Sequence, residues 1–344
     1  MSEGIAWTDR PVKPYPLPFR PLPDTRRRWK PRALHGMQKA PFQPRPAIAM
    51  PRPTPSANAP RLLVTGASGR VGRLLRPFWR DAPVALQWRG TGPLSDGALP
   101  GPHWSLMEGP AALLDWCETH GRPDALLVLS GVTPGGGDPG LNIALAEAAL
   151  EGAKAAGIAR VLLASSAAVY GHARATPWHE DDRATPASPY GAAKLAMEQA
   201  AARWRGPGLT VCCLRIGNVA GADALLSRIP SAAPLIIDRF PDGTTPERSY
   251  IGPRNLARVL LALAGPGLSL PPILNLAAPA PVSMGDLADA AGQRWQPRPA
   301  PPEAIARLVL DCRALEALVG FQPADSLPRT LITEWRAAGA QEAP

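Results

Sequence analysis

A tyrosine and a lysine four residues apart form a pair whose types and spacing suit proton transfer. Tyr190 and Lys194 stand in the segment Pro-Tyr-Gly-Ala-Ala-Lys, and at i, i+4 they share one face of a helix. A tyrosine with a pKa of about 10 is a poor base at neutral pH, and a nearby ammonium favours its phenolate. The pair could therefore move a proton to or from a substrate hydroxyl or carbonyl oxygen.

A serine hydroxyl is expected beside this pair. Ser165 and Ser166 follow an apolar run that reads as a parallel strand, and open α/β sheets place their sites at the carboxyl ends of strands. A hydroxyl there can bind the same oxygen whose proton the tyrosine moves. Without it, an exposed tyrosine and lysine on a surface helix would be the better interpretation.

Three glycines fit a dinucleotide-binding loop. They follow an apolar strand and open a helix at G-x-x-G-x-x-G spacing. The first permits a tight turn, the second lets the backbone approach a pyrophosphate, and the third packs helix on strand, while the helix N-terminus offers N–H groups to phosphates. An ordinary turn is the alternative. The residues expected to contact the cofactor here are Gly66, Ser68, Gly69, Arg70, Val71 and Gly72.

The end of the second expected strand indicates which cofactor is bound. An NAD site calls for an acidic residue on the ribose hydroxyls about 20 residues past the glycines, whereas an arginine there suits a 2′-phosphate. Here the strand ends at Arg89 with no acid between Asp81 and Asp96, and Arg70 lies in the glycine loop. We therefore predict NADP, with NAD as the alternative. Arg89 could also be a solvated charge at the strand end.

These residues need a frame of alternating strands and helices. From residue 61 on, short apolar runs alternate with helix-period segments, which is the pattern of βαβ units around a parallel sheet. We expect strands over 61–65, 84–88, 125–130, 160–165, 209–214 and 273–276. We expect helices over 70–80, 109–119, 141–156, 190–204, 253–264, 284–293 and 327–337, and Pro77 should kink or end the first one early. The predicted fold class is α/β, a Rossmann-type doubly wound parallel sheet with a smaller C-terminal substrate lobe.

Composition divides the chain near residue 60. Of the 44 prolines, 14 lie in residues 1–60 with 11 Lys/Arg and three acids, so 11 − 3 = +8 of the net +9 charge lies there. Proline at this density prevents a helix or a central strand. We predict a disordered tail over 1–59, a Rossmann core over 60–221 to which 248–276 returns, and a small substrate-binding lobe from 222–247 and 277–338. A basic arm for nucleic acid or another acidic surface is the alternative for the tail.

Other features exclude several classes of protein. With 45% hydrophobic and 19% charged residues, the chain is not wholly disordered. Its four cysteines lack C-x-x-C spacing and read as reduced core thiols of a cytoplasmic protein. No apolar run reaches the roughly 18 residues of a membrane span, and no cluster has metal-ligand spacing. We expect a cytoplasmic enzyme with a small-molecule substrate, no metal, no membrane partner and no nucleic-acid partner; a homodimer stays open.

The order of these motifs resembles that of the extended short-chain dehydrogenase/reductases, in the NAD-dependent epimerase/dehydratase group, which act mostly on nucleotide sugars. The resemblance covers about residues 61–338. Residues 165–171 look like the family's S-S-x-x-V-Y-G, residues 189–194 like its P-Y-x-x-x-K, and residues 214–221 like its L-R-x-x-N-V-Y-G. Residues 248–251 resemble its R-D-F-I segment.

The resemblance implies a role for each matching catalytic residue. It makes Ser166 the catalytic hydroxyl, Tyr190 the acid/base and Lys194 the ligand of the cofactor ribose. Asn142 matches the helix asparagine that often belongs to a proton relay. These four residues are the predicted catalytic set.

The same resemblance implies further contacts with cofactor and substrate. Ser130 and Gly131 stand where the family usually has two small residues beside the cofactor. Asn218 matches an asparagine that faces the substrate's phosphate region, and Arg248 an arginine that often grips a nucleotide pyrophosphate. Ala167-Ala168 stands where nucleotide-sugar 4,6-dehydratases carry Asp-Glu, so we expect no 4,6-dehydratase activity.

The function implied is that of an NAD(P)-dependent epimerase or oxidoreductase acting by hydride transfer. Its substrate would be nucleotide-sugar-like or another hydroxyl or carbonyl compound. A tightly kept cofactor gives epimerisation, and an exchanging one gives net oxidation or reduction. Two alternatives stay open: an NADP-dependent reductase of a small carbonyl compound, and a non-catalytic dinucleotide-binding protein with a basic tethering tail.

Overall fold

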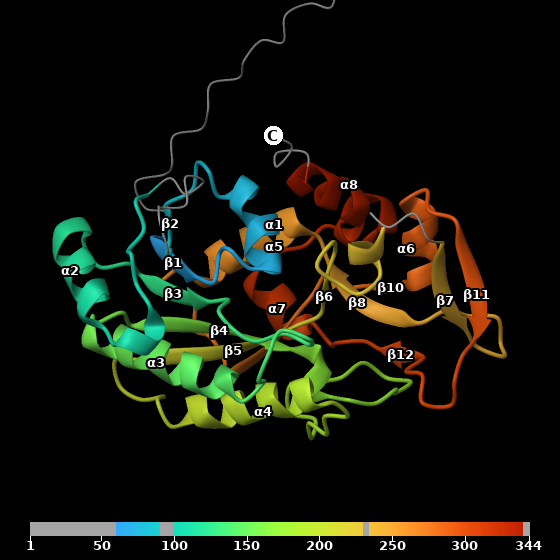
Figure 1. Ribbon diagram of the computed structural model, residues 1–344, viewed down its shortest axis with the longest axis horizontal. Coiled ribbons are helices and arrows are strands. Elements are labelled where there is room, and N and C mark those ends of the chain that lie inside the picture. Colours follow the sequence, from blue (N-terminus) through green and yellow to red (C-terminus); the bar gives the residue numbers. More distant parts are fainter. Residues whose placement is uncertain (1–59, 90–98, 230–233, 340–344) are drawn as a thin grey trace, which may run out of the picture. The chain divides into compact units, whose positions relative to one another are not determined.

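A six-stranded parallel sheet forms the centre of the described part of the chain (Figure 1). The computed structural model describes residues 60–89, 99–229 and 234–339, so the predictions for residues 1–59 lie outside the described residues. The strand order is β2-β1-β3-β4-β5-β9. The strands are β1 (Leu62–Thr65), β2 (Val84–Leu86), β3 (Ala125–Val128), β4 (Arg160–Ser166), β5 (Thr210–Ile216) and β9 (Ile273–Leu276). This is the Rossmann-type doubly wound sheet that the sequence predicts, and its strand order reverses between β1 and β3, where such sheets bind ligands.

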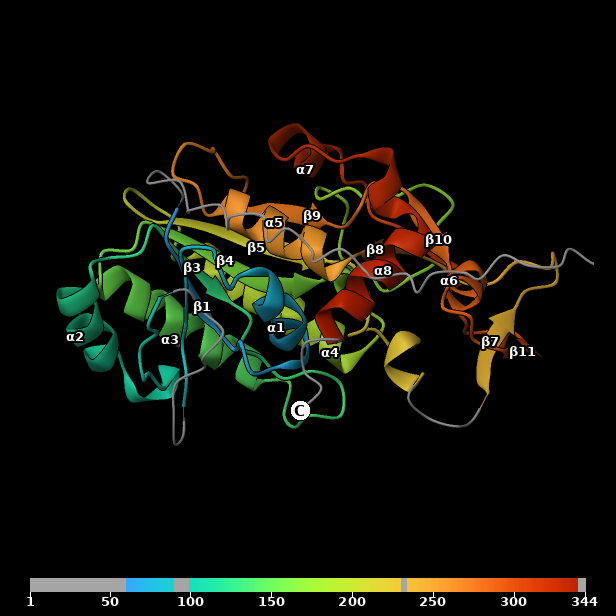
Figure 2. The same ribbon diagram turned by 90° about the horizontal axis from the view of Figure 1, so that it is seen from above.

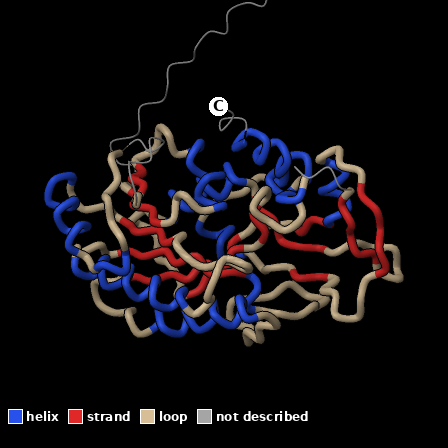
Figure 3. The backbone as a smooth tube through the Cα atoms, viewed as in Figure 1, coloured by secondary structure: helices blue, strands red, loops and turns tan. Residues whose placement is uncertain are grey.

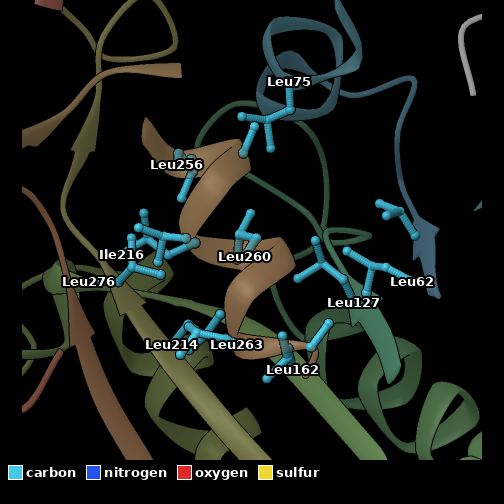
Figure 4. Close-up of a cluster of buried hydrophobic side chains, with 14 of the residues drawn as sticks. Leu62, Leu75, Leu127, Leu162, Leu214, Ile216, Leu256, Leu260, Leu263 and Leu276 are labelled. Carbon is cyan, nitrogen blue, oxygen red and sulfur yellow. The ribbon is translucent and has the colours of Figure 1, made fainter. Parts of the chain in front are cut away.

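Helices cover both faces of this sheet (Figures 1 and 2). One face carries α1 (Arg70–Leu75) and α5 (Pro253–Leu263), and the other carries α2 (Ala111–His120), α3 (Leu141–Ala155) and α4 (Pro189–Ala202). Figure 4 shows the leucines of α5 packed over those of β3, β4 and β5. Leu62 and Val64 pack on the α1 side and Leu63 on the α4 side, because successive strand residues point to opposite faces.

A smaller set of strands follows the main sheet (Figure 3). Strand β8 (Glu247–Ile251) pairs with β6 (Asn218–Val219), β10 (Pro281–Ser283) and β12 (Arg307–Leu308), while β7 (Leu235–Arg239) pairs with β11 (Trp295–Pro299). Helices α6 (Met284–Ala290) and α8 (Pro328–Gly339) cover a separate apolar core, and α7 (Arg313–Leu318) packs on the main one. The 3-10 turns are Arg76–Phe78, Leu106–Glu108, Ala167–Val169, Leu226–Arg228 and Pro323–Ser326.

The expected early end of the first helix is confirmed. Helix α1 stops at Leu75, and a 3-10 turn containing Pro77 follows. Proline lacks an N–H and its ring clashes with the preceding turn, so the α-helical pattern cannot run through it. The short helix α7 and the strands of the smaller sheet are not among the elements expected from the sequence.

Three of the four cysteines are buried in the core, as expected, whereas Cys117 is half-buried. All four cysteines are free, and Cys212, Cys213 and Cys312 are buried. No helix of the described ranges is long and apolar enough to cross a membrane.

Candidate active site

The glycine loop lies directly against the ends of two neighbouring segments. Gly66 has φ +76°, and a β-carbon there would lie 2.4 Å from the backbone nitrogen of Ser130. A β-carbon on Gly72 would lie 2.5 Å from the backbone of Ala67, which explains why the helix can pack so closely on its own loop. Gly69 precedes α1 without any side-chain cap, so the first turn keeps its N–H groups free of a capping side chain. The dinucleotide-phosphate site expected from the glycine spacing stays a prediction.

The predicted loop contacts differ in exposure. Ser68, Gly69 and Arg70 are exposed, whereas Val71 is half-buried against the core. Ser68, Gly69 and Arg70 are therefore accessible to an anion, and Val71 is less so.

Gln87 holds the loop from the end of β2 and was missed in the sequence. Its side chain is buried, its Oε1 accepts a hydrogen bond from the Gly66 N–H at 3.4 Å, and its Nε2 donates to the Trp104 carbonyl. A neutral amide thus stands at the strand end where an NAD site would carry an acid. Arg89 is exposed and is the last described residue before the gap at 90–98.

Tyr190 and Ser166 meet at the carboxyl end of β4. Ser188 caps α4 by accepting from the Gly191 N–H at 3.1 Å, which puts Tyr190 in the first turn. The Ser166 hydroxyl lies close enough to the Tyr190 phenol to act on its pKa. Burial raises the pKa of Tyr190, while Ser166 and the charge of Arg70 act in the opposite direction. Arg70 thereby links the glycine loop to the candidate acid/base.

Lys194 lies deeper than the sequence analysis expects. Its Nζ donates to the Ala164 carbonyl of β4 at 2.8 Å, and only 5% of the residue is exposed. Burial lowers the pKa of Lys194 to about 8, against the opposing effects of Cys213 and Glu198. The expectation that Lys194 lowers the pKa of Tyr190 is not met, since the cation acting on the phenol is Arg70 and burial dominates.

Asn142 joins Lys194 to the loop that follows β3. Its Oδ1 accepts from the Val132 N–H at 3.1 Å, and its Nδ2 donates to the carbonyls of Val132 at 3.1 Å and Pro139 at 2.9 Å. A β-carbon on Gly131 would lie 2.6 Å from the Asn142 Oδ1 and 3.2 Å from the Lys194 Nζ. The structure thus brings Gly131, Asn142 and Lys194 together, with Asn142 holding backbone rather than facing open space.

The two predicted substrate residues lie on the smaller sheet. Asn218 of β6 pairs with Tyr250 of β8 in the sheet, and its side chain acts on the pKa of the Tyr250 hydroxyl. The Arg248 guanidinium donates to the carbonyls of Glu247 at 2.7 Å and Ile305 at 2.8 Å, and burial lowers its pKa. Among the described residues its hydrogen-bond partners are carbonyl oxygens, so its charge is solvated by dipoles rather than paired. No hydrogen bond of the described residues connects either side chain to Tyr190.

A buried carboxylate behind the site was also missed. Glu198 of α4 accepts hydrogen bonds from Ser165 and Arg215, and its residue is 4% exposed. It follows Lys194 by four residues, so the spacing of Tyr190, Lys194 and Glu198 places all three on one helix face. That repeated spacing is the signal that could have found it.

Comparison with known families shows to which family the chain belongs. The family model described as NAD dependent epimerase/dehydratase family matches residues 62–263, which contain the glycine loop and the Ser166, Tyr190 and Lys194 positions. The chain belongs to the NAD-dependent epimerase/dehydratase family.

Individual proteins are also similar to this chain. A UDP-glucose 4-epimerase of Azospirillum brasilense is 35% identical over 185 residues, which are 49% of this chain and 51% of the relative. The match therefore spans about half the length of that relative. The structure of MoeE5 in complex with UDP-glucuronic acid and NAD has 25% identity and a TM-score of 0.62, covering 80% of this chain and 99% of MoeE5.

The fold of the family is shared more widely still. A UDP-glucose-4-epimerase from Stenotrophomonas maltophila, with bound NAD and formylated UDP-arabinopyranose, has a TM-score of 0.67 at 21% identity. It covers 82% of this chain and 98% of its own. At this identity the likeness concerns the fold, which agrees with the sheet order described above.

Proposed function

We propose that this protein is an NAD(P)-dependent epimerase or oxidoreductase that acts on a nucleotide-sugar-like substrate, with Tyr190, Lys194 and Ser166 as its catalytic residues. The observation that supports this most is that Ser166, at the carboxyl end of β4, lies close enough to the Tyr190 phenol to act on its pKa, as does the charge of Arg70 from the glycine loop. Two hydroxyls and a phosphate-binding loop then face one reacting centre.

Each residue has a distinct task in this proposal. Tyr190 takes the proton of a substrate hydroxyl as that carbon is oxidised and returns it when a carbonyl is reduced. Ser166 donates a hydrogen bond to the same oxygen and stabilises the negative charge that develops on it. Lys194 would hold the cofactor ribose and supply a positive charge there, and Asn142 keeps the backbone at Val132 in place.

The cofactor is proposed to be NADP, with NAD as the alternative. A nicotinamide dinucleotide supplies the hydride acceptor and donor when bound. Its phosphates would be held at the exposed Gly69 and Arg70, where α1 begins without a side-chain cap. Gln87 removes the negative charge that would repel a 2′-phosphate, and Arg70 and Arg89 are both exposed cations. MoeE5, by contrast, was solved with NAD.

A nucleotide-sugar substrate is supported by the smaller sheet and by the relatives. The Arg248 guanidinium hydrogen-bonds only carbonyl oxygens among the described residues, so a pyrophosphate could bind it without breaking an ion pair. The Azospirillum brasilense relative is a UDP-glucose 4-epimerase, and MoeE5 was solved with UDP-glucuronic acid. Both lines of argument favour a sugar carried on a nucleoside diphosphate.

We further propose epimerisation or redox chemistry rather than 4,6-dehydration. Elimination of water needs an acid and a base near the sugar, and the two residues after Ser166 are Ala167 and Ala168. The fold alone does not separate the reactions, since a dTDP-glucose 4,6-dehydratase has a TM-score of 0.62 at 23% identity.

The experiment that tests the proposal is a substrate screen with two readouts. Purified full-length protein is incubated with NAD or NADP and with UDP- and dTDP-sugars, or with small aldehydes and ketones. Sugar configuration is followed by NMR and reduced nicotinamide by absorbance. Turnover of a nucleotide sugar that requires Tyr190 supports the proposal; turnover of small carbonyls alone replaces the substrate class, and cofactor binding without any turnover supports the non-catalytic alternative.

A further inference from the structure

We propose that Asp223 is a positioning residue for the substrate, which ties the 221–226 turn after Asn218 to the strand that carries Arg248 and so sets the place of a nucleoside diphosphate. The inference rests on the proposed function, because Asn218 and Arg248 are the residues predicted to face that group. Asp223 itself is 8% exposed and its hydrogen-bond partners are other residues, so it acts through them.

The first support is the way in which one carboxylate closes the 221–226 turn. Asp223 Oδ2 accepts a hydrogen bond from the Gly221 N–H at 3.2 Å. Its Oδ1 accepts from the N–H groups of Leu225 at 2.8 Å and Leu226 at 3.2 Å. Both ends of the turn are thereby held by the same side chain.

The second support is a bond from the same carboxylate to β8. The Tyr250 hydroxyl donates to Asp223 Oδ1 at 3.3 Å, and Tyr250 is fully buried. Tyr250 pairs with Asn218 across β6 and β8. It also follows Arg248 by two residues, so the two side chains share one face of β8. One buried hydroxyl therefore links the turn to the part of the sheet that is predicted to hold the substrate.

The four partners of Asp223 are all donors, three N–H groups and one O–H group. An ionised carboxylate only accepts hydrogen bonds and so matches this set, whereas an amide would turn its own hydrogens toward one of the donors. Burial raises the pKa of Asp223, and the backbone hydrogen bonds act in the opposite direction. Within the described ranges these four donors are its hydrogen-bond partners, so the loss of one should weaken the hold on the whole turn.

Helix α8 covers the same turn from outside. Gly221 has φ +94°, and a β-carbon there would lie 2.1 Å from Trp335 Cδ1, so the indole lies directly on the turn. The neighbouring Glu334 accepts from the Asn255 N–H at 3.1 Å, which ties α8 to the start of α5 on the main sheet. The turn therefore lies between β8 and α8, and Asp223 is the residue that connects it to β8 by a side-chain hydrogen bond.

Two substitutions of minimal size test the inference. Asp223→Asn keeps the shape of the side chain but sets an amide against one donor, and Tyr250→Phe removes only the hydroxyl that joins the turn to β8. The full-length protein is titrated by calorimetry with UDP and dTDP as probes, and separately with NAD and NADP. We expect the Kd of the nucleoside diphosphate to rise by about tenfold in each variant, the size of one lost hydrogen bond, and the Kd of the dinucleotide to change by less than about twofold.

A matched control and a second readout separate positioning from a general loss of stability. Asp242→Asn makes the same change in a carboxylate of an exposed turn, where Oδ1 accepts from the Thr244 N–H at 2.9 Å, and it should leave all these constants unchanged. Hydrogen exchange followed by mass spectrometry should be faster over 218–226 in Asp223→Asn than in the wild type. Tyr250→Phe keeps the three backbone bonds of the turn, so it tests the link to β8 even where Asp223→Asn does not fold.

Several results would overturn the inference. Unchanged affinity for the diphosphate in both variants would mean that Asp223 only stabilises the fold. Equal weakening of diphosphate and dinucleotide would mean that the whole protein has loosened, and unchanged exchange over 218–226 would mean that the carboxylate does not hold the turn. A wild-type protein that binds neither UDP nor dTDP would overturn the nucleotide-sugar substrate and this inference with it, whereas failure of the inference alone shows only in the variants.

Discussion

The α-carbon hydrogen of Gly66 faces the backbone nitrogen of Ser130 so closely that a β-carbon would lie 2.4 Å from that nitrogen. The first glycine of the loop and the second residue after β3 are thus in direct backbone contact, at the point where the strand order reverses. The crevice expected for a dinucleotide is consequently built on a contact that a side chain at residue 66 would break.

Gly66→Ala should cost more stability than the same substitution at a glycine in an unhindered left-handed turn. The left-handed conformation alone costs an alanine about 1–2 kcal/mol, and the clash with Ser130 should add about 1–3 kcal/mol. Gly208→Ala is the matched control, because Gly208 has φ +84° and nothing within 4 Å of its β-carbon position. Urea unfolding of both variants measures the difference; equal losses would mean that the loop shifts away from β3 freely.

Tyr190→Phe should slow the chemical step by about 100-fold or more, the usual size of a general acid–base contribution. The ring and its packing stay, and the glycine loop and Lys194 are untouched, so the Kd of the cofactor should change little. Single-turnover hydride transfer measures the step. Unchanged transfer in Tyr190→Phe would refute the role of the phenol even though the fold and family stand.

Lys194→Met should weaken cofactor binding by about 10- to 100-fold, the value of a hydrogen bond from a charged group. Lys154→Met is the control, since Lys154 lies exposed on α3 and Lys194 buried on α4. Equilibrium titration with NAD and NADP gives both constants. If the two variants bind the cofactor alike, Lys194 is a packing residue and not a ribose ligand.

Arg89→Ala and Arg70→Ala should each reduce the preference for NADP over NAD. An arginine–phosphate pair is worth about 1–3 kcal/mol. The Kd for NAD divided by the Kd for NADP should therefore fall by about tenfold in each variant. Arg329→Ala, which removes an exposed arginine of α8, controls for net charge. NAD binding as tight as NADP in the wild type, with no change in the variants, would favour the NAD alternative.

The buried ammonium of Lys194 should make stability depend on alkaline pH. Its pKa is about 8 in the folded chain and 10.5 as a free side chain, so the unfolded chain binds more protons between these values. The lysine contribution to the free energy of unfolding should therefore rise from pH 8 to pH 10.5, by about 3 kcal/mol.

The matched measurement is the difference in unfolding free energy between the wild type and Lys194→Met across this range. Subtraction matters because burial also raises the pKa of Cys213, so the unfolded chain loses thiol protons first and stability falls above pH 9. The wild type should gain on the variant as pH rises. A constant difference would show that Lys194 titrates normally in the folded chain.

The sequence predicts the main sheet well because its strands are buried on both faces. Such strands read as continuous apolar runs, and the prediction for β9 agrees with the structure at both ends while β4 runs one residue further to Ser166. The strands of the smaller sheet are short and partly exposed, so β12 has two residues and β10 three, with no period to detect.

The candidate site divides in the same way between local and tertiary information. The shared helix face of Tyr190 and Lys194 follows from their spacing alone. The partner of Lys194, however, is a carbonyl of β4 thirty residues away in sequence, and the partner of Gln87 is a glycine N–H of the loop. Such contacts depend on how strands and helices pack, which no local spacing reveals.

The position of β9 has a consequence for synthesis on the ribosome. This strand completes the main sheet beside β5, yet it lies at Ile273–Leu276, after β6, β7 and β8 of the smaller sheet. Until residue 276 has emerged from the exit tunnel, β5 presents unpaired N–H and carbonyl groups to other chains or to a chaperone. A nascent chain stalled between Ile251 and Ile273 should thus be the most prone to aggregate, although it already carries the glycine loop, Ser166, Tyr190 and Lys194.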